Sequence, residues 1–254
     1  MAKIVEMINP ITGLPEQVDK LDHTAQEIDD AVALAPQISN PNLLDNWYFG
    51  NPVNQRGKTE HTGNATEYFI DRWKLGGYNQ TVTITNSGLH WSTTAGIWCT
   101  QTIENFDELI GRTLTLSAII DGVLYSVTGV LNESSGIGMQ PVGHLFVELT
   151  HNEKCFRFIT YNYPTPTVTI LAAKLELGSQ QTLAHQDANG NWVFNEIPDY
   201  GEQLRRCQRY FQLYSSADLR PAKAVDCRPT MRADPSQSTI VVNSTTYYYN
   251  TADL

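Results

Sequence analysis

A repeat of two residues runs from Thr66 to about Leu177, and it constrains the fold more than any other feature of the sequence. Successive side chains of a β-strand point to opposite faces, so alternation within segments rich in Val, Ile, Thr and aromatic residues predicts strands. The segments read "TEYFIDRW", "QTVTITN", "GLHWS", "GIWCTQTI", "TLTLSAII", "VLYSVTGV", "HLFVELTH", "CFRFITY" and "TVTILAAKLEL". No helical period interrupts them, which excludes a βαβ plan and predicts an antiparallel β-sandwich or barrel. Asp121-Gly122 is a two-residue hairpin signal, and residues 132–138 read as a loop.

Before the predicted strands, the apolar residues repeat with a different period. Apolar residues recur at spacings of 3 and 4, as in the seam of a coiled coil, at Val18, Leu21, Ala25, Ile28, Val32 and Ala35. Pro15 suits the first helical turn, and Pro36 disfavours helix at the residue before it. We therefore predict a helix over about 15–35 and a homotrimer joined through the first five seam residues. The alternative is an amphipathic helix that lies on its own domain.

The segment "NPNLLDNWYFGNPVNQRG", residues 40–57, connects the predicted helix to the strands. We expect Leu43 or Leu44, Trp47 and Phe49 to enter the sandwich as its first, partly irregular strand, and Arg56 to anchor a turn.

After Gly178 the composition becomes polar. Asn189-Gly190 predicts a small hairpin, and Asp199 with Glu202 three residues later predicts the start of a helix. "STIVV" and "TTYYYN" read as further strands. The predicted fold is thus mainly β in three parts: an attachment segment with a trimerising helix (1–39), a β-sandwich (40–178) and an α+β element (179–254).

The net charge of the chain limits the kinds of partner that it can bind. With 17 Lys and Arg against 27 Asp and Glu, the formal net charge is -10, so the surface on average repels phosphate backbones. We expect no nucleic-acid partner. The first residues form no signal-peptide core, and no stretch approaches 18 apolar residues, so we expect no membrane insertion.

The sequence contains no catalytic or metal-binding motif at a diagnostic spacing. We therefore predict no catalytic residue, no metal site and no cofactor. Glycoside hydrolysis stays an alternative, because a pair of carboxylates is enough for it and four lie in or beside the predicted strands: Asp71, Glu104, Glu148 and Glu176.

Aromatic side chains are the other chemical resource, since their faces stack on apolar faces of ligands such as sugar rings. The candidate glycan-binding residues are Trp91, Tyr161 and Tyr163, the last two on one strand face by their separation of two. Trp98 is a further candidate, but its apolar strand context, like that of Trp73, favours a core position.

Several motifs in a fixed order resemble the fibre and receptor-binding type of virion protein found in tailed phages. They are "NLLDNWYFGNPVNQRG", "YFIDRWKLGG", "AAKLELGSQQT", "YGEQLRRCQRYFQ" and "RPTMRADPS", and the fourth contains Cys207, Gln208, Arg209 and Tyr210. The resemblance spans about residues 40–235. It implies a jelly roll similar to carbohydrate-binding modules, followed by a short element with the Cys-Gln-Arg-Tyr motif.

The resemblance further implies a non-enzymatic trimeric tail or head fibre. Such a protein would be assembled in the cytoplasm of the bacterial host, bound to other virion proteins through its N-terminal segment, and exposed on the virion surface to attach to host glycans. A head-fibre or capsid decoration protein without its own receptor is the first alternative. A glycoside hydrolase acting on host surface polysaccharide is the second.

Overall fold

The computed structural model describes residues 39–254 apart from 64–65, 78–79, 94–95, 162–164, 220, 243 and 254, together with two strands near the N-terminus. The chain divides into two units, residues 1–38 and residues 39–254. Residues 40–178 and 179–254, predicted as separate parts, belong to the same unit.

The first unit contains an antiparallel hairpin of β1 (Ile4–Ile8) and β2 (Pro15–Asp19), in which Val5 lies opposite Val18. The prediction of a helix beginning at Pro15 is therefore wrong. The backbone of residues 15–19 pairs with β1 instead of forming helical hydrogen bonds, and the sequence between the two strands holds Asn9-Pro10 and Gly13, which favour turns. Residues 20–38 lie outside the described residues, so the helix there stays a prediction.

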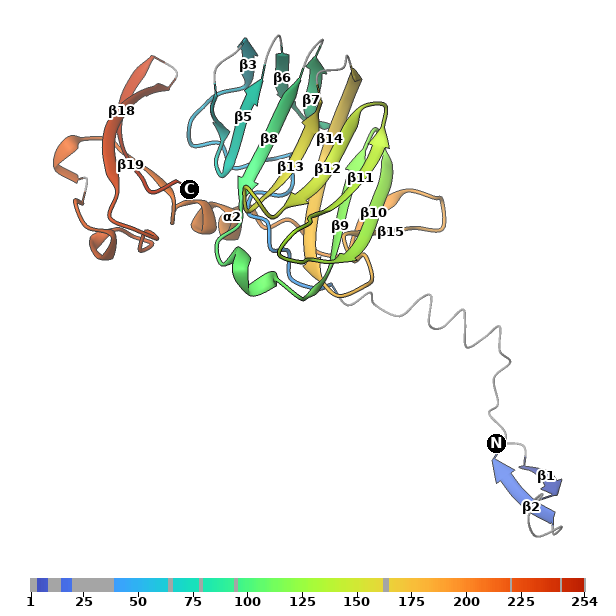
Figure 1. The fold of residues 1–254 in the computed structure, drawn as a ribbon. Coiled ribbons are helices and arrows are strands. Elements are labelled where there is room, and N and C mark those ends of the chain that lie inside the picture. Colours follow the sequence, from blue (N-terminus) through green and yellow to red (C-terminus); the bar gives the residue numbers. More distant parts are fainter. Residues whose placement is uncertain are drawn as a thin grey trace. The chain divides into compact units, whose positions relative to one another are not determined.

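Two six-stranded antiparallel sheets face each other in the second unit (Figure 1). The first sheet has the order β10 (Val123–Val130), β9 (Thr113–Ile120), β14 (Thr165–Leu177), β7 (Gly88–Thr93), β6 (Gln80–Thr85) and β3 (Glu60–Gly63). The second has the order β11 (Ile137–Val142), β12 (Leu145–Thr150), β13 (Cys155–Thr160), β8 (Ile97–Thr102), β5 (Trp73–Gly77) and β4 (Glu67–Ile70). The prediction of a mainly β fold with antiparallel strands is confirmed.

The core lies between the sheets and follows the predicted alternation. In β8, Ile97, Cys99 and Gln101 are buried, whereas the residues between them are half-buried on the outer face. Trp73 and Phe158 are fully buried, with ring centroids 6.0 Å apart. Burial of such aromatic side chains supplies much of the free energy that stabilises a sandwich.

The structure agrees with the predicted turns more closely than with the predicted strands. Asp121 and Gly122 both have positive φ, 49° and 74°, as the predicted two-residue hairpin between β9 and β10 requires. β3, β5 and β11 are not among the predicted strands, and the segment "TEYFIDRW" spans β4, the turn at Asp71 and Arg72, and the first residue of β5. Part of β11 falls in the predicted loop 132–138, because Gly138 and Pro141 weaken its strand character.

The connecting segment joins the first sheet beside β14. Leu43 N–H donates to the carbonyl of Leu175 and Phe49 N–H to that of Leu171, each at 2.8 Å, and Tyr48 forms an isolated bridge with Ala172. Leu44, Trp47 and Phe49 are buried. The expectation that Leu44, Trp47 and Phe49 enter the sandwich is confirmed, but residues 43–49 form one isolated bridge, at Tyr48, and no strand.

A buried lysine fastens the start of this segment. Lys174 of β14 is 1% exposed, and its Nζ donates to Ser39 Oγ at 2.6 Å and to Thr182 Oγ1 at 3.0 Å. Glu176, fully buried, accepts from the backbone N–H of Thr182 at 2.7 Å. A buried charge needs such partners, so Lys174 and Glu176 together fix residues 39 and 182 to the first sheet.

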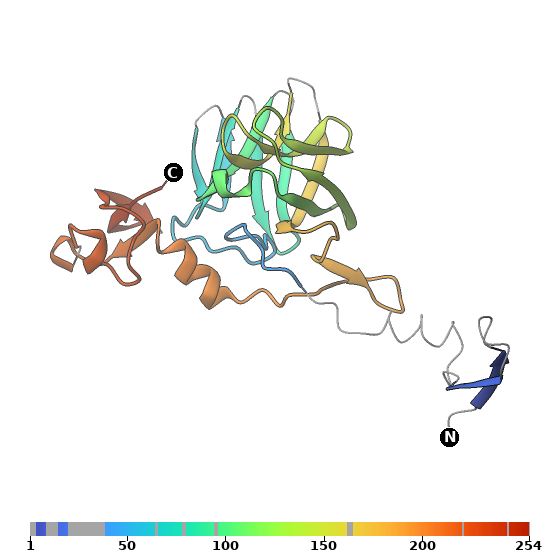
Figure 2. The same cartoon turned by 60° about the horizontal axis from the view of Figure 1, so that its bottom comes forward.

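The part after Gly178 contains the hairpin β15 (Ala184–Gln186) and β16 (Trp192–Phe194), the helix α2 (Tyr200–Cys207), the short helices η2 (Ala217–Leu219) and η3 (Ala224–Asp226), and a three-stranded sheet. That sheet has the order β17 (Phe211–Tyr214), β19 (Thr245–Thr251) and β18 (Ser236–Val242). The predicted cap of α2 is confirmed, since the side chain of Asp199 accepts from Glu202 N–H at 2.9 Å. Figure 2 shows α2 at the end of the sandwich where the connecting segment also runs.

Arg56 does more than anchor a turn. Its guanidinium lies 2.6 Å from the carboxylate of Asp253 and 3.8 Å from that of Asp71, and it covers the ring of Phe211 at 3.8 Å from the centroid. Arg56 thus joins the sandwich to the C-terminal sheet. Asp71 is fully buried, and burial raises the pKa of its carboxyl to about 7 against the opposing effect of Arg56.

Replacing Asp71 by Asn tests this pKa. Between about pH 4 and pH 7 the folded protein keeps a proton on Asp71 that the unfolded chain has released, so the free energy of unfolding falls as the pH rises through this window. D71N lacks this dependence. Urea unfolding at pH 4.5, 6 and 8 is expected to show wild type losing stability relative to D71N by about 3 kcal/mol over this range. If the difference in unfolding free energy between wild type and D71N is the same at all three pH values, the pKa of Asp71 is not raised in the folded protein.

Candidate functional site

The outer face of the second sheet carries a tryptophan in an accessible position. Trp98 of β8 is half-buried and points away from the core, between the inward-facing Ile97 and Cys99. A Cβ at Gly76 would lie 2.4 Å from Cζ2 and 2.6 Å from Cε2 of this indole. The ring therefore packs against the backbone of β5 in the space that the glycine leaves.

Strand pairing places two rows of side chains across this face. Trp98 lies opposite Gly76 on one side and Ile159 on the other, and Ile159 lies opposite Phe146. The second row consists of Lys74, Thr100, Arg157 and Glu148. An apolar row thus runs beside a polar row, both at right angles to the strands.

Charged groups in the polar row are held in place by one another. Arg157 Nε lies 2.9 Å from Glu148 Oε2, and its Nη1 lies 2.9 Å from Glu153 Oε2. Tyr161 Oη contacts both partners of the first pair, at 2.9 Å from Arg157 Nη2 and 2.9 Å from Glu148 Oε2. Burial lowers the pKa of Arg157, but its hydrogen bond to Glu148 and the charges of Glu148 and Glu153 together outweigh this and the pKa is raised, so the guanidinium stays charged.

These rows border a groove of about 420 Å³, which we call the outer-face groove. It is lined by Thr66, Lys74, Trp98, Thr100, Thr102, Glu153, Cys155, Arg157 and Ile159. Indole and isoleucine offer an apolar surface, while hydroxyl, ammonium, guanidinium and carboxylate groups lie beside it. An apolar wall with a few fixed polar groups is the usual composition of a ligand site.

The predicted glycan-binding residues lie in different places. Trp91 is 1% exposed in the core, with its ring centroid 6.5 Å from that of Phe158. It offers no face to a ligand, so its assignment is corrected. Tyr161 is 42% exposed and borders the outer-face groove through Arg157, whereas Tyr163 lies outside the described residues. The sequence predicts a core position for Trp98 and an accessible one for Trp91. The structure has the reverse, with Trp98 on the outer face of the second sheet.

Of the predicted oligomerisation residues, Val18 lies in β2 and not in a helix. Leu21, Ala25, Ile28 and Val32 lie outside the described residues.

A second feature lies at the end of the sandwich near α2, where the motifs of the resemblance meet. Asp45 of the connecting segment accepts from Arg72 Nε at 3.0 Å and lies 2.6 Å from Arg206 Nε of α2. Arg72 is 3% exposed, donates to the carbonyl of Thr102 at 2.9 Å, and stacks 3.5 Å above the centroid of Tyr210. Burial disfavours its charge, but Asp45 more than compensates, and the pKa of Arg72 is raised.

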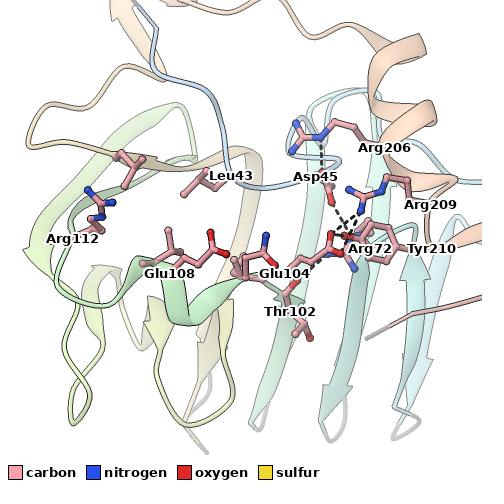
Figure 3. A pocket seen from close by; sticks show the side chains of 14 residues that line it. Leu43, Asp45, Arg72, Thr102, Glu104, Glu108, Arg112, Arg206, Arg209 and Tyr210 are labelled. Atoms are coloured by element: carbon pink, nitrogen blue, oxygen red, sulfur yellow. Dashed lines mark hydrogen bonds and ion pairs between the residues drawn. The ribbon is translucent and has the colours of Figure 1, made fainter. Parts of the chain in front are cut away.

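Glu104 makes a parallel set of contacts a short distance along the same end (Figure 3). Tyr210 Oη donates to it at 2.7 Å, Arg209 Nη2 lies 3.3 Å away, and Arg232 Nε lies 3.9 Å away. We call the contacts around Asp45 and Glu104 the arginine junction. It connects residues 45, 72, 104, 206, 209, 210 and 232, and so binds the connecting segment, the second sheet and the C-terminal part together.

The four carboxylates considered for hydrolysis do not share one accessible site. Asp71 and Glu176 are fully buried within hydrogen-bonded networks. Glu104 belongs to the arginine junction, and Glu148 is bound by Arg157 beside the outer-face groove. A glycosidase needs two carboxyl groups that flank the same bond, so these four residues give no support to a hydrolase.

The described residues include no group of three His, Cys, Asp or Glu side chains placed to bind a metal ion. None of their helices has the length and apolar character needed to cross a membrane.

Comparisons of the chain with protein-family models, with curated proteins and with solved structures found no match.

The arginine junction predicts a large effect for Asp45→Ala. This substitution leaves Arg72 buried without its carboxylate, which costs about 3 kcal/mol or more. Glu108→Ala is the matched control, because Glu108 is exposed and the described residues give it no ion pair; it should change stability by less than about 0.5 kcal/mol. Equal unfolding midpoints for the two variants in guanidinium chloride would show that the junction does not stabilise the fold.

Proposed function

We propose that the chain is a non-enzymatic fibre or receptor-binding protein of a phage virion, and that it attaches to host-surface glycans through the outer-face groove. The sandwich would correspond to a jelly roll similar to carbohydrate-binding modules. The observation that carries the proposal is Trp98, an indole packed on β5 at Gly76 and lining an open groove beside fixed polar groups.

The chemistry of the groove supports a sugar ligand. A sugar ring has apolar C–H faces that can lie on an indole, and a rim of hydroxyl groups that need donors and acceptors. Glu148, Arg157 and Tyr161 already form a closed set of hydrogen bonds, so their remaining lone pairs and N–H groups are held in fixed directions. Such preorganisation reduces the entropy lost on binding.

The apolar and polar rows extend across β5, β8, β13 and β12, which at a strand spacing of about 4.8 Å corresponds to roughly 14 Å. This length favours an oligosaccharide segment over a single sugar. Affinity per groove should be low, and presentation on a trimer would raise it through effective concentration.

The trimer is proposed from the sequence alone. It would be joined through Leu21, Ala25, Ile28 and Val32, with the N-terminal segment bound to other virion proteins on the tail or head. A head-fibre or capsid decoration protein without its own receptor differs from this proposal only in lacking the ligand.

Trp98→Ala tests the ligand site. Loss of one stacking platform costs about 1–3 kcal/mol for nucleic-acid bases, and a comparable loss should weaken binding to an array of bacterial surface polysaccharides by roughly tenfold. Trp192→Ala is the control, because Trp192 is also half-buried but lies on β16, with its indole N–H donating to the carbonyl of Gly122. Binding that both variants retain would place the ligand elsewhere, and no binding by wild type would favour the decoration protein.

Light scattering on the purified full chain tests the trimer. A mass of about three times 28.4 kDa is expected, and replacing both Leu21 and Ile28 by Asp should reduce it while the circular dichroism of the β-sandwich stays unchanged. A monomer at micromolar concentration would contradict the trimer without affecting the proposed ligand site.

A further inference from the structure

A second cavity lies beside the arginine junction and has a different chemistry from the outer-face groove. It measures about 440 Å³, and we call it the base cavity. Its lining combines side chains from the connecting segment, η1 (Phe106–Leu109), the end of β14 and α2. Figure 3 shows Arg112 and Glu108 on one side of it and Arg72, Arg206 and Arg209 on the other.

Positive charge is in local excess at this cavity. Asp45 is shared by two guanidinium groups, those of Arg72 and Arg206. Glu104 is likewise shared by Arg209 and Arg232. The chain as a whole carries a formal net charge of -10, so a cavity bordered by more guanidinium than carboxylate groups departs from the rest of its surface. An anion would balance the excess.

Two arginines retain unused donors. Arg72 is 3% exposed and lines the cavity, yet its Nη1 is buried without a hydrogen-bond partner. Arg112 lines the cavity and is exposed, and the described residues supply no partner for its guanidinium. A buried donor without a partner costs free energy. Because Nη1 of Arg72 is buried, the exposed guanidinium of Arg112 is the donor of these two that a ligand with acceptor oxygens can reach.

The remaining lining suggests what carries the negative charge. Leu43 and Leu109 are half-buried, and Leu177 is 46% exposed, so the cavity has an apolar wall. Glu108 adds a carboxylate without an ion pair in the described residues; it accepts hydrogen bonds from hydroxyl groups and repels a second anion close to it. A ligand with one anionic group, several hydroxyls and an apolar face satisfies all these conditions.

We infer that the base cavity binds an anionic sugar unit. Its carboxylate or phosphate group pairs with Arg112, its hydroxyls donate to Glu108, and its apolar face lies on Leu43 and Leu177. This site is separate from the outer-face groove, and the inference does not depend on binding there. A uronic acid and a sugar phosphate present the same chemistry to the arginines, so both serve as probes.

Isothermal titration of the full chain at low salt, with D-glucuronate, D-glucose 6-phosphate and D-glucose, tests the inference. At least one of the two anions is expected to bind with a dissociation constant of about 1 mM, and D-glucose at least tenfold more weakly. Binding should weaken as the salt concentration rises. The anion that binds more tightly identifies the charged group as carboxylate or phosphate.

Arg112→Gln should weaken binding of the tighter anion at least fivefold without changing the thermal midpoint, because the contacts of Arg112 within the described residues are backbone hydrogen bonds, which the substitution keeps. Arg205→Gln is the matched control, since Arg205 is exposed on α2, pairs with Glu202 and does not line the cavity. Its binding should equal that of wild type. Failure of both anions to bind at 20-fold the expected dissociation constant, or equal binding by R112Q and R205Q, would overturn the inference.

Discussion

The ion pair between Arg72 and Asp45 is the contact on which the arrangement of residues 39–254 depends. Arg72 sits at the turn between β4 and β5 with φ at 71°, and this turn directs its guanidinium toward the connecting segment. Once the guanidinium is buried it needs a carboxylate, so Asp45 must lie beside it. Arg206 and Tyr210 then dock on the same pair and bring the C-terminal part to this end of the sandwich.

Several of the motifs quoted in the sequence analysis meet at this junction. "LLDN" contributes Asp45, "DRW" contributes Arg72, and "RRCQRY" contributes Arg206, Arg209 and Tyr210. "AAKLELGSQQT" contributes Lys174, Glu176 and Thr182, which fasten the start of the same segment. These motifs therefore hold the parts of the chain together. The proposed ligand residues of the outer-face groove lie largely outside these motifs, and so could vary without changing the fold.

Local features of the fold could be predicted from the sequence, whereas the candidate site could not. Asp121-Gly122 and the Asp199 cap depend on neighbouring residues and were predicted correctly. Trp98 lies between Ile97 and Cys99, so three apolar residues in a row give no alternation, and only the sheet decides which face the indole occupies. The Arg72–Asp45 contact joins residues that no short-range pattern links. Val18 begins the heptad spacing, yet residues 15–19 pair with β1.

The account predicts that the arginine junction supports the fold while the outer face of the second sheet binds glycan. The indole N–H signals of the five tryptophans in a ¹H–¹⁵N spectrum test this most directly. On addition of polysaccharide fragments from the host surface, the signal of Trp98 should shift, and those of the buried Trp47, Trp73 and Trp91 and of Trp192 should stay in place. Shifts confined to Trp192, or binding without any shift of Trp98, would contradict the account.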